Sequence, residues 1–177
     1  QSLLNGIDIR KYRYADYIRI FSVVFQDFQL LALPLGENVA GAADYDRTRA
    51  TDCLNKAGFT DRLAGMPLGL DTYLYKDLEK EGVEISGGEA QKIAIARSLY
   101  RDAPFIILDE PTAALDPLAE AEIYAKFKDI AGDKTAIYIS HRLSSCKFCD
   151  EIAVFDEGQV VQQGNHDQLL AAEDGLY

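Results

Sequence analysis

The sequence contains few cysteines and no long hydrophobic run. Only 3 of the 177 residues are cysteine and no secretory signal precedes them, so we expect reduced thiols in a cytosolic setting and no disulfide. No segment approaches the roughly 18 consecutive apolar residues that a membrane-spanning helix needs. Any role at a membrane is therefore expected to depend on a partner.

Basic residues are also scarce relative to acidic ones. The chain has 18 Lys and Arg against 29 Asp and Glu, which gives a formal net charge of -11. This charge would repel a phosphate backbone, and no cluster of Lys and Arg is dense enough to override it, so nucleic acid is disfavoured as a partner. A localised anion site is compatible with the charge. The length suits one compact domain, or one domain with an inserted lobe.

Short β-branched and aromatic runs bounded by turn residues predict strands at residues 17–25, 105–109, 135–140, 151–156 and 159–163. Apolar residues at helical spacing in residues 118–131 predict a strand, helix, strand unit with a parallel crossover. Asp156-Glu157-Gly158 predicts a tight turn that joins the last two strands as an antiparallel pair. The pattern is typical of an α/β fold.

A long stretch between the first and second predicted strands has few strand signals. Helical patterns at residues 46–57 and 89–100 predict a helical lobe inserted into the sheet domain. We expect the lobe to span approximately residues 27–100, with residues 1–26 and 101–177 forming the sheet core.

Two acidic residues follow the buried strand predicted at residues 105–109. The apolar run from Phe105 to Leu108 ends abruptly in Asp109-Glu110-Pro111. A lone acid at a strand end is most often there because it prefers solvent. Two carboxylates at the carboxyl end of a buried strand can instead hold Mg²⁺ through water and polarise a water for attack on a phosphoryl group.

Ser86-Gly87-Gly88 directly precedes the helical pattern that begins near Glu89. Unhindered backbone N–H groups and a hydroxyl at a helix N-terminus form an anion site. The alternative is a flexible Gly-Gly turn in which Ser86 only caps the helix, and for the tripeptide alone the two interpretations are about equally good.

Two further polar residues follow predicted strands. His141 comes just after the strand at residues 135–140, where ligands bind in parallel sheets, although a lone histidine there is more often structural. Gln26 closes the first strand, where its amide could reach a metal or a water. Neither residue is informative alone.

Taken in order, these motifs resemble an ATP-binding-cassette (ABC) domain from just after its first nucleotide loop to its end. Gln26 falls at the Q-loop of that family, residues 85–89 at the signature motif, residues 105–110 at the Walker B strand and catalytic glutamate, residues 113–116 at the D-loop, and His141 at the switch histidine. Five motifs in the correct order make chance agreement very improbable.

The resemblance implies a P-loop NTPase-like ATPase that uses ATP and Mg²⁺. It implies catalytic roles for Glu110 and His141 and metal contact for Asp109 and Gln26. Nucleotide contacts are implied for Gln26, Ser86, Gly87, Gly88, Glu89 and Asp116. Glu89 departs from the usual glutamine and adds a negative charge near an anion site, and Ala113 replaces the common serine of the D-loop.

The resemblance also implies partners. Two copies would sandwich two nucleotides, with Ser86-Gly87-Gly88 of one copy facing ATP held by the other. Residues 79–82 resemble the loop that exporters press against the coupling helices of their transmembrane domain, and Gly164-Asn165-His166 followed by Leu169-Leu170 resembles the exporter ending. The expected function is to energise an exporter from the cytoplasmic face of the membrane.

One motif of the family is missing from the sequence. No G-x-x-x-x-G-K-[ST] pattern, the Walker A loop, occurs in it, and Gly132-Asp133-Lys134-Thr135 is no substitute because it leads into a predicted strand. Residues 1–9 resemble the antiparallel strand that follows Walker A. We therefore expect the N-terminal part of the fold to be missing, and the 177 residues alone to be inactive.

Other interpretations stay open on the sequence alone. An ABC-type ATPase head of a DNA-repair or chromosome-organising protein shares the signature and Walker B motifs, and acidity counts against it. A non-enzymatic binding module would fit the missing Walker A but not Glu110 and His141. Cys146 and Cys149 form a C-x-x-C spacing that lacks a second pair for zinc, and we predict two small apolar helix positions instead.

Overall fold

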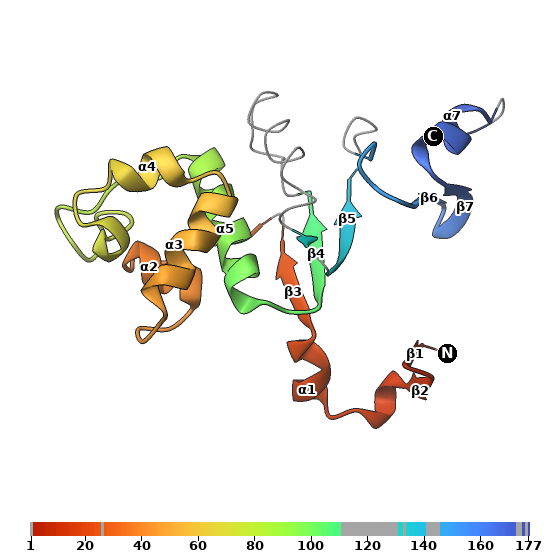
Figure 1. Ribbon diagram of the computed structural model, residues 1–177, viewed down its shortest axis with the longest axis horizontal. Coiled ribbons are helices and arrows are strands. Elements are labelled where there is room, and N and C mark those ends of the chain that lie inside the picture. Colours follow the sequence, from red (N-terminus) through yellow and green to blue (C-terminus); the bar gives the residue numbers. More distant parts are fainter. Residues whose placement is uncertain are drawn as a thin grey trace. The chain divides into compact units, whose positions relative to one another are not determined.

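The computed structural model describes residues 2–25, 27–110, 131–132, 134–140, 146–172, 175 and 177. Two compact units, Gln1–Ile137 and Tyr138–Tyr177, make up the chain. The elements described follow the order shown in Figure 1: β1 (Leu3–Leu4), β2 (Ile7–Asp8), the 3-10 helix η1 (Ile9–Lys11), α1 (Tyr14–Arg19), β3 (Phe21–Val24), α2 (Leu35–Ala40), α3 (Arg47–Lys56), α4 (Thr60–Ala64), the 3-10 helix η2 (Gly69–Asp71), α5 (Gly87–Arg101), β4 (Phe105–Asp109), β5 (Thr135–Ile139), β6 (Ile152–Asp156), β7 (Gln159–Gly164) and α7 (His166–Leu170). None of the described helices is long and apolar enough to cross a bilayer.

A three-stranded sheet has the order β3-β4-β5, and β3 and β4 belong to the first unit. Strands β3 and β4 are parallel, with Phe21 opposite Phe105 and Val24 opposite Leu108. Ile106 and Leu108 of β4 are almost completely buried, as its unbroken apolar run requires. The predicted α/β fold is confirmed, and β4 has the predicted bounds.

Helix α5 packs against β3 and carries the lobe of helices onto the sheet (Figure 1). Its apolar face is buried through Ile93, Ile95 and their neighbours. A buried polar contact joins the two elements, because the Ser22 hydroxyl of β3 lies 2.7 Å from the Ser98 hydroxyl and 2.9 Å from the Ser98 carbonyl oxygen. The sheet and the helix that begins at the signature motif are therefore one packed assembly.

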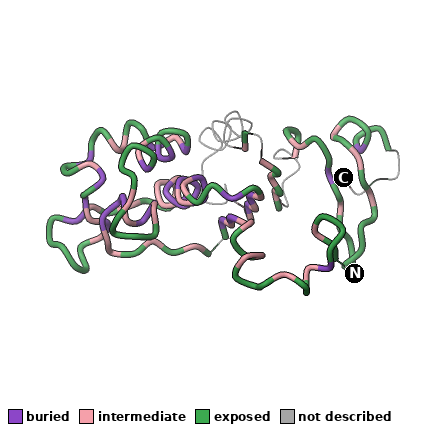
Figure 2. The backbone as a smooth tube through the Cα atoms, turned by 60° about the horizontal axis from the view of Figure 1, so that its bottom comes forward, coloured by how far each residue is buried: buried purple, intermediate pink, exposed green. Residues whose placement is uncertain are grey.

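The helices α2 and α3 also pack against α5 and build a separate apolar core. Figure 2 shows the buried positions gathered along these helices, and the fully buried side chains include Leu35, Val39, Leu54, Phe59 and Leu74. Helix α3 begins directly after Asp46, whose side chain accepts a hydrogen bond from the Arg49 N–H. The helices predicted at residues 46–57 and 89–100 are thus confirmed as α3 and α5, each with slightly shifted ends.

Two strand predictions in the N-terminal region are wrong. The run predicted as a strand at residues 17–25 contains the end of α1, and only Phe21–Val24 is a strand. The single strand predicted at residues 1–9 is a hairpin of β1 and β2, because Asn5 and Gly6 have φ values of 50° and 75° and reverse the chain. An Asn-Gly pair between apolar residues favours a two-residue hairpin turn, which accounts for the difference.

The second unit, Tyr138–Tyr177, contains the antiparallel pair β6 and β7. The predicted turn is confirmed, since Glu157 and Gly158 both have positive φ between the two strands. Helix α7 follows, capped reciprocally by Asn165 and Gln168. The helix predicted at residues 118–131 lies outside the described residues except at its last position.

Candidate functional site

The first candidate site is the start of α5. Ser86 has extended backbone angles, with φ -69° and ψ 161°, and Gly87 opens the helix. The Ser86 hydroxyl accepts a hydrogen bond from the Glu89 N–H at 3.3 Å, and a Glu89 carboxylate oxygen accepts one from the Ser86 N–H at 2.8 Å. This reciprocal capping box fixes the direction in which the chain enters the helix.

The same start leaves backbone donors for a ligand. Within the described part of the chain, the N–H groups of Gly87 and Gly88 donate no hydrogen bond to another residue. Helix α5 has 15 residues, so its N-terminus carries a partial positive charge, and the glycines add no side chain over the two donors. The capping function of Ser86 and an anion site at the next two residues are thus compatible, although the sequence presented them as alternatives.

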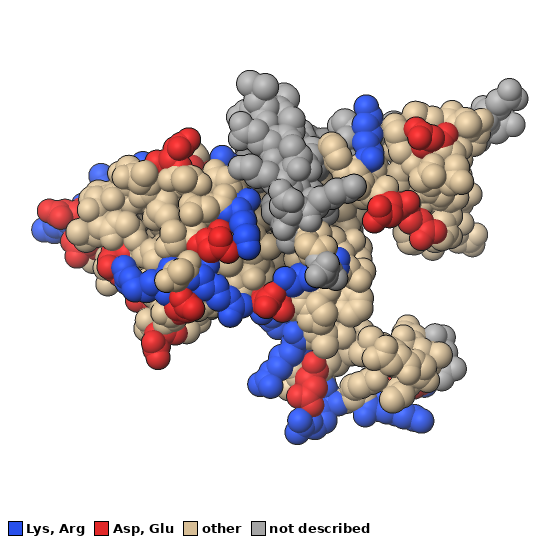
Figure 3. Space-filling view, in the orientation of Figure 1, with Lys and Arg blue, Asp and Glu red and all other residues tan. Residues whose placement is uncertain are grey.

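The charge that Glu89 adds to this end has a partner. Arg62 of α4 lies with Nε 2.6 Å from a Glu89 carboxylate oxygen. Other charges on the helical lobe are paired too, as with Arg47 and Asp71 at 2.8 Å. On the face drawn in Figure 3, acidic and basic side chains are interspersed over the lobe. Sequence reasoning missed Arg62, because no local spacing links it to the start of α5.

The second candidate site is the carboxyl end of β4. Since Val24 lies opposite Leu108 in parallel strands, the end of β3 and the partly buried Asp109 lie at the same edge of the sheet. Glu110 follows with φ 47°, in the left-handed region that few residues other than glycine adopt. The buried Gln91 of α5 donates a hydrogen bond from Nε2 to the Glu110 carbonyl oxygen at 3.2 Å. A side chain from the second turn of α5 thus holds the backbone of this strand end.

Three of the predicted site residues lie outside the described residues: Gln26, Asp116 and His141. Phe25, which precedes Gln26, is described and exposed at the end of β3. Within the described residues, no group of three or more His, Cys, Asp or Glu side chains is arranged to hold a metal ion. Mg²⁺ usually takes only one or two carboxylates together with waters and substrate phosphates, so Asp109 fits such a role.

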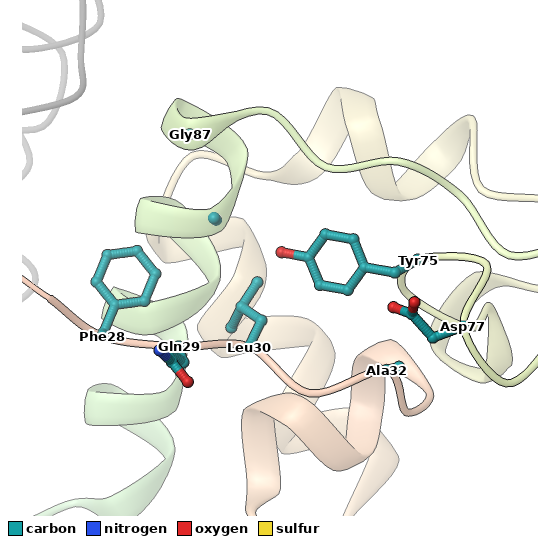
Figure 4. Close-up of a pocket in the computed structure, with 8 residues that line it drawn as sticks. Phe28, Gln29, Leu30, Ala32, Tyr75, Asp77 and Gly87 are labelled. Carbon is teal, nitrogen blue, oxygen red and sulfur yellow. The ribbon is translucent and has the colours of Figure 1, made fainter.

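A groove of about 540 Å³ lies beside the start of α5 (Figure 4). Its walls come from the segment after Gln26, from the loop before α5 and from the first turn of α5, and its lining residues are Phe28, Gln29, Leu30, Ala32, Tyr75, Asp77, Gly87 and Ala90. Figure 4 shows the Tyr75 side chain extending toward Leu30. Burial is the main cause that raises the pKa of Tyr75, followed by the nearby charge of Glu84.

Both walls of the groove are held by specific contacts. The buried Asn38 exchanges two hydrogen bonds with the backbone of Leu31, each 2.9 Å long, and Arg97 of α5 donates to the Gln29 carbonyl oxygen at 3.3 Å. Burial lowers the pKa of Arg97. On the other wall, a side chain at Gly82 would collide with the Tyr75 carbonyl oxygen, so this turn requires glycine. The sequence did not predict the groove; it predicted only that residues 79–82 face the coupling helices of a transmembrane domain.

The C-x-x-C segment is not helical, contrary to the sequence prediction. Cys146 and Cys149 are thiols at the two ends of a turn, and the Cys149 N–H donates to the Cys146 carbonyl oxygen at 3.1 Å. Burial raises the pKa of the Cys149 thiol and the nearby Cys146 adds to the shift. A raised pKa makes the thiolate scarcer at neutral pH, which disfavours reactivity.

Comparison with known proteins gives a consistent result. The profile of the ABC transporter family matches residues 1–113. The chain is 40% identical over 176 residues to an ATP-dependent lipid A-core flippase of Vibrio cholerae, covering 98% of this chain and 29% of the relative. It is 37% identical over 174 residues to the subtilin transport ATP-binding protein SpaT of Bacillus subtilis, covering 95% of this chain and 28% of the relative.

A solved structure agrees with these relatives. The structure of a bacterial Atm1-family ABC exporter with ATP bound superposes with a TM-score of 0.87 at 35% identity, covering 99% of this chain and 30% of the other. The chain therefore spans less than a third of the length of the proteins it matches. The family profile, the sequence relatives and the solved structure agree, and this chain belongs to the ABC transporter family.

Proposed function

We propose that this chain is part of the ATP-binding and ATP-hydrolysing domain of an ABC exporter. The observation that carries the proposal is the start of α5, where a capping box leaves the Gly87 and Gly88 N–H groups without a partner among the described residues, at the N-terminus of a 15-residue helix. An anion such as the γ-phosphate of ATP is the ligand that these donors suit. The relatives named for ATP-dependent transport support the same conclusion.

In this proposal each nucleotide lies between two copies of the domain. The Ser86 hydroxyl and the two glycine N–H groups of one copy donate to the phosphate of ATP held by the other copy. Because Ser86 Oγ accepts from the Glu89 N–H, its own hydrogen is available for that phosphate. We also assign nucleotide contacts to Glu89 and Asp116, as the family resemblance implies.

The strand end supplies the chemistry of hydrolysis. Glu110 aligns the attacking water and accepts a proton from it. His141 stabilises the position of the attacking water and the γ-phosphate. Asp109, through water, and Gln26 would hold Mg²⁺, which would neutralise part of the phosphate charge. The hydrogen bond from Gln91 to the Glu110 carbonyl oxygen supports the backbone that carries the base.

The groove beside α5 is proposed as the docking site for a helix of the transmembrane partner. Phe28, Leu30 and Tyr75 offer apolar contact and Asp77 offers a carboxylate at the rim, which suits a short amphipathic helix with a basic residue. Gly87 and Ala90 line the same groove, so an occupant would touch the first turn of α5. Through such a partner the domain would act at the cytoplasmic face of a membrane.

The test compares two proteins, the 177-residue chain and the full-length parent in which we propose it functions. The parent is expected to bind ATP and to hydrolyse it with Mg²⁺. The isolated chain is expected to bind ATP weakly and to show no measurable turnover, because it has no G-x-x-x-x-G-K-[ST] cradle for the β- and γ-phosphates. A parent without ATPase activity would overturn the proposal, and turnover by the isolated chain would show that other residues hold the phosphates.

A further inference from the structure

Arg62 reaches the start of α5 at two points. Its Nη2 donates a hydrogen bond to the Glu84 carbonyl oxygen at 3.2 Å, two residues before the capping serine. Its Nε lies 2.6 Å from Oε1 of Glu89, in the first turn of the helix; this contact is an ion pair whose angles are not those of a hydrogen bond. One guanidinium on α4 thus holds the chain on both sides of Ser86-Gly87-Gly88.

The carboxylate of Glu89 has both oxygens engaged. Oε2 accepts from the Ser86 N–H at 2.8 Å, and Oε1 faces Arg62. The pair is partly shielded from solvent, with side-chain exposures of 37% for Arg62 and 26% for Glu89. Solvent therefore screens these charges less than it screens fully exposed ones.

Glu89 creates an electrostatic conflict that Arg62 removes. A negative charge in the first turn stabilises the helix itself, but it opposes a phosphate that binds to the first-turn N–H groups. A glutamine at this position would complete the same capping box without the charge. The cap therefore does not depend on Arg62, whereas an anion beside Glu89 would be stabilised by a cation that offsets the carboxylate charge.

We propose that Arg62 is a positioning residue for the nucleotide, which offsets the charge of Glu89 and holds the start of α5 in place for phosphate contact. The inference rests on the proposed function, because it concerns the same anion site. Arg62 acts through Glu89 and Glu84 and does not itself touch the phosphate. The alternative role is an ordinary surface ion pair that affects only the stability of the lobe.

The experiment measures ATP-induced dimer formation by sedimentation in the full-length parent carrying Glu110→Gln, together with thermal stability. Arg62→Gln keeps a donor for the Glu84 carbonyl oxygen but removes the positive charge, and we expect it to weaken dimer formation about three- to tenfold. Adding Glu89→Gln should recover most of that loss, because both charges are then absent. Arg62→Lys, which keeps the charge, should lose less than Arg62→Gln.

Arg47→Ala is the matched control, since it breaks the Arg47–Asp71 ion pair on the same lobe away from Ser86. It should leave dimer formation unchanged. Two results would overturn the inference but not the proposed function. One is equal dimer formation by the parent and Arg62→Gln. The other is a loss of dimer formation in Arg62→Gln that Glu89→Gln does not recover and that matches a loss of thermal stability. Absence of ATP-induced dimers in the parent would overturn the proposed function and the inference with it.

Discussion

The two ends of helix α5 differ in how their backbone groups, which lack partners within the helix, are hydrogen-bonded. At its C-terminus, Asp102 adopts the left-handed conformation with φ 55°, and its N–H donates to the Leu99 carbonyl oxygen at 3.1 Å. Arg49 donates to the Tyr100 carbonyl oxygen, and its guanidinium lies 4.7 Å from the centre of the Tyr100 ring. Lys134 pairs with the Asp102 carboxylate at 2.5 Å, and this bond is the main cause that lowers the pKa of Asp102.

At its N-terminus only some of the backbone N–H groups of the helix are hydrogen-bonded to described residues. The capping box uses the N–H groups of Ser86 and Glu89, while those of Gly87 and Gly88 find no partner among the described residues. The C-cap residue Asp102 and Arg49 of α3 thus satisfy the Leu99 and Tyr100 carbonyl oxygens at one end, whereas two N–H groups at the other end stay available. This difference is what our proposal requires, in which one end of α5 serves the fold and the other binds a phosphate.

The largest expected effect is at the strand end that α5 supports through Gln91. Glu110→Gln in the full-length parent should keep ATP binding and lower turnover by about 10²- to 10⁴-fold, because it removes the base but keeps the shape. Glu157→Gln is the matched control, since Glu157 also has φ 47° but lies in the turn between β6 and β7. Steady-state ATPase rates and nucleotide binding check both variants, and unchanged turnover in Glu110→Gln would contradict the assigned role.

A smaller effect, on stability alone, is expected at the C-terminal end of α5. Arg49→Ala removes the contact with the Tyr100 carbonyl oxygen and the stacking on its ring, so the free energy of unfolding should fall by about 1 kcal/mol. ATP-induced dimer formation should be unaffected. Denaturant unfolding and sedimentation measure the two quantities. If the variant lost dimer formation while keeping its stability, the contrast between the two ends of α5 would be wrong.

Several elements of the fold could be predicted because the sequence patterns that specify them are local. The strand β4 is an unbroken apolar run that ends in acids, and α3 is preceded by its capping Asp46. The prediction failed where local patterns compete, since the β-branched and aromatic run from Tyr17 predicts a strand throughout, but residues 17–19 form the end of α1. There Arg13 pairs with Asp16 at 2.7 Å, and Arg101 of α5 donates to the Ile18 carbonyl oxygen at 3.2 Å, a contact that no local pattern reveals.

The candidate site divides in the same way. Ser86, Gly87 and Gly88 could be proposed from the sequence, because a capping residue and two glycines before a helical pattern have a direct physical meaning. Arg62 and the groove residues Phe28 and Tyr75 come together only when α4 and the loops fold against α5. Their roles depend on tertiary contacts, which composition and spacing do not encode.

The most direct test of the central claim is ATP-induced dimer formation by the full-length parent carrying Glu110→Gln, with and without Ser86→Arg. Ser86→Ala serves as the control, because it also removes the capping hydroxyl and should cost about 1 kcal/mol of stability without adding bulk. If the start of α5 binds the phosphate of ATP held by a second copy, Ser86→Arg should block dimer formation while Ser86→Ala only weakens it, since the larger side chain excludes the phosphate sterically. Equal dimer formation by the parent and both variants would contradict the account and leave Ser86 as a helix cap alone.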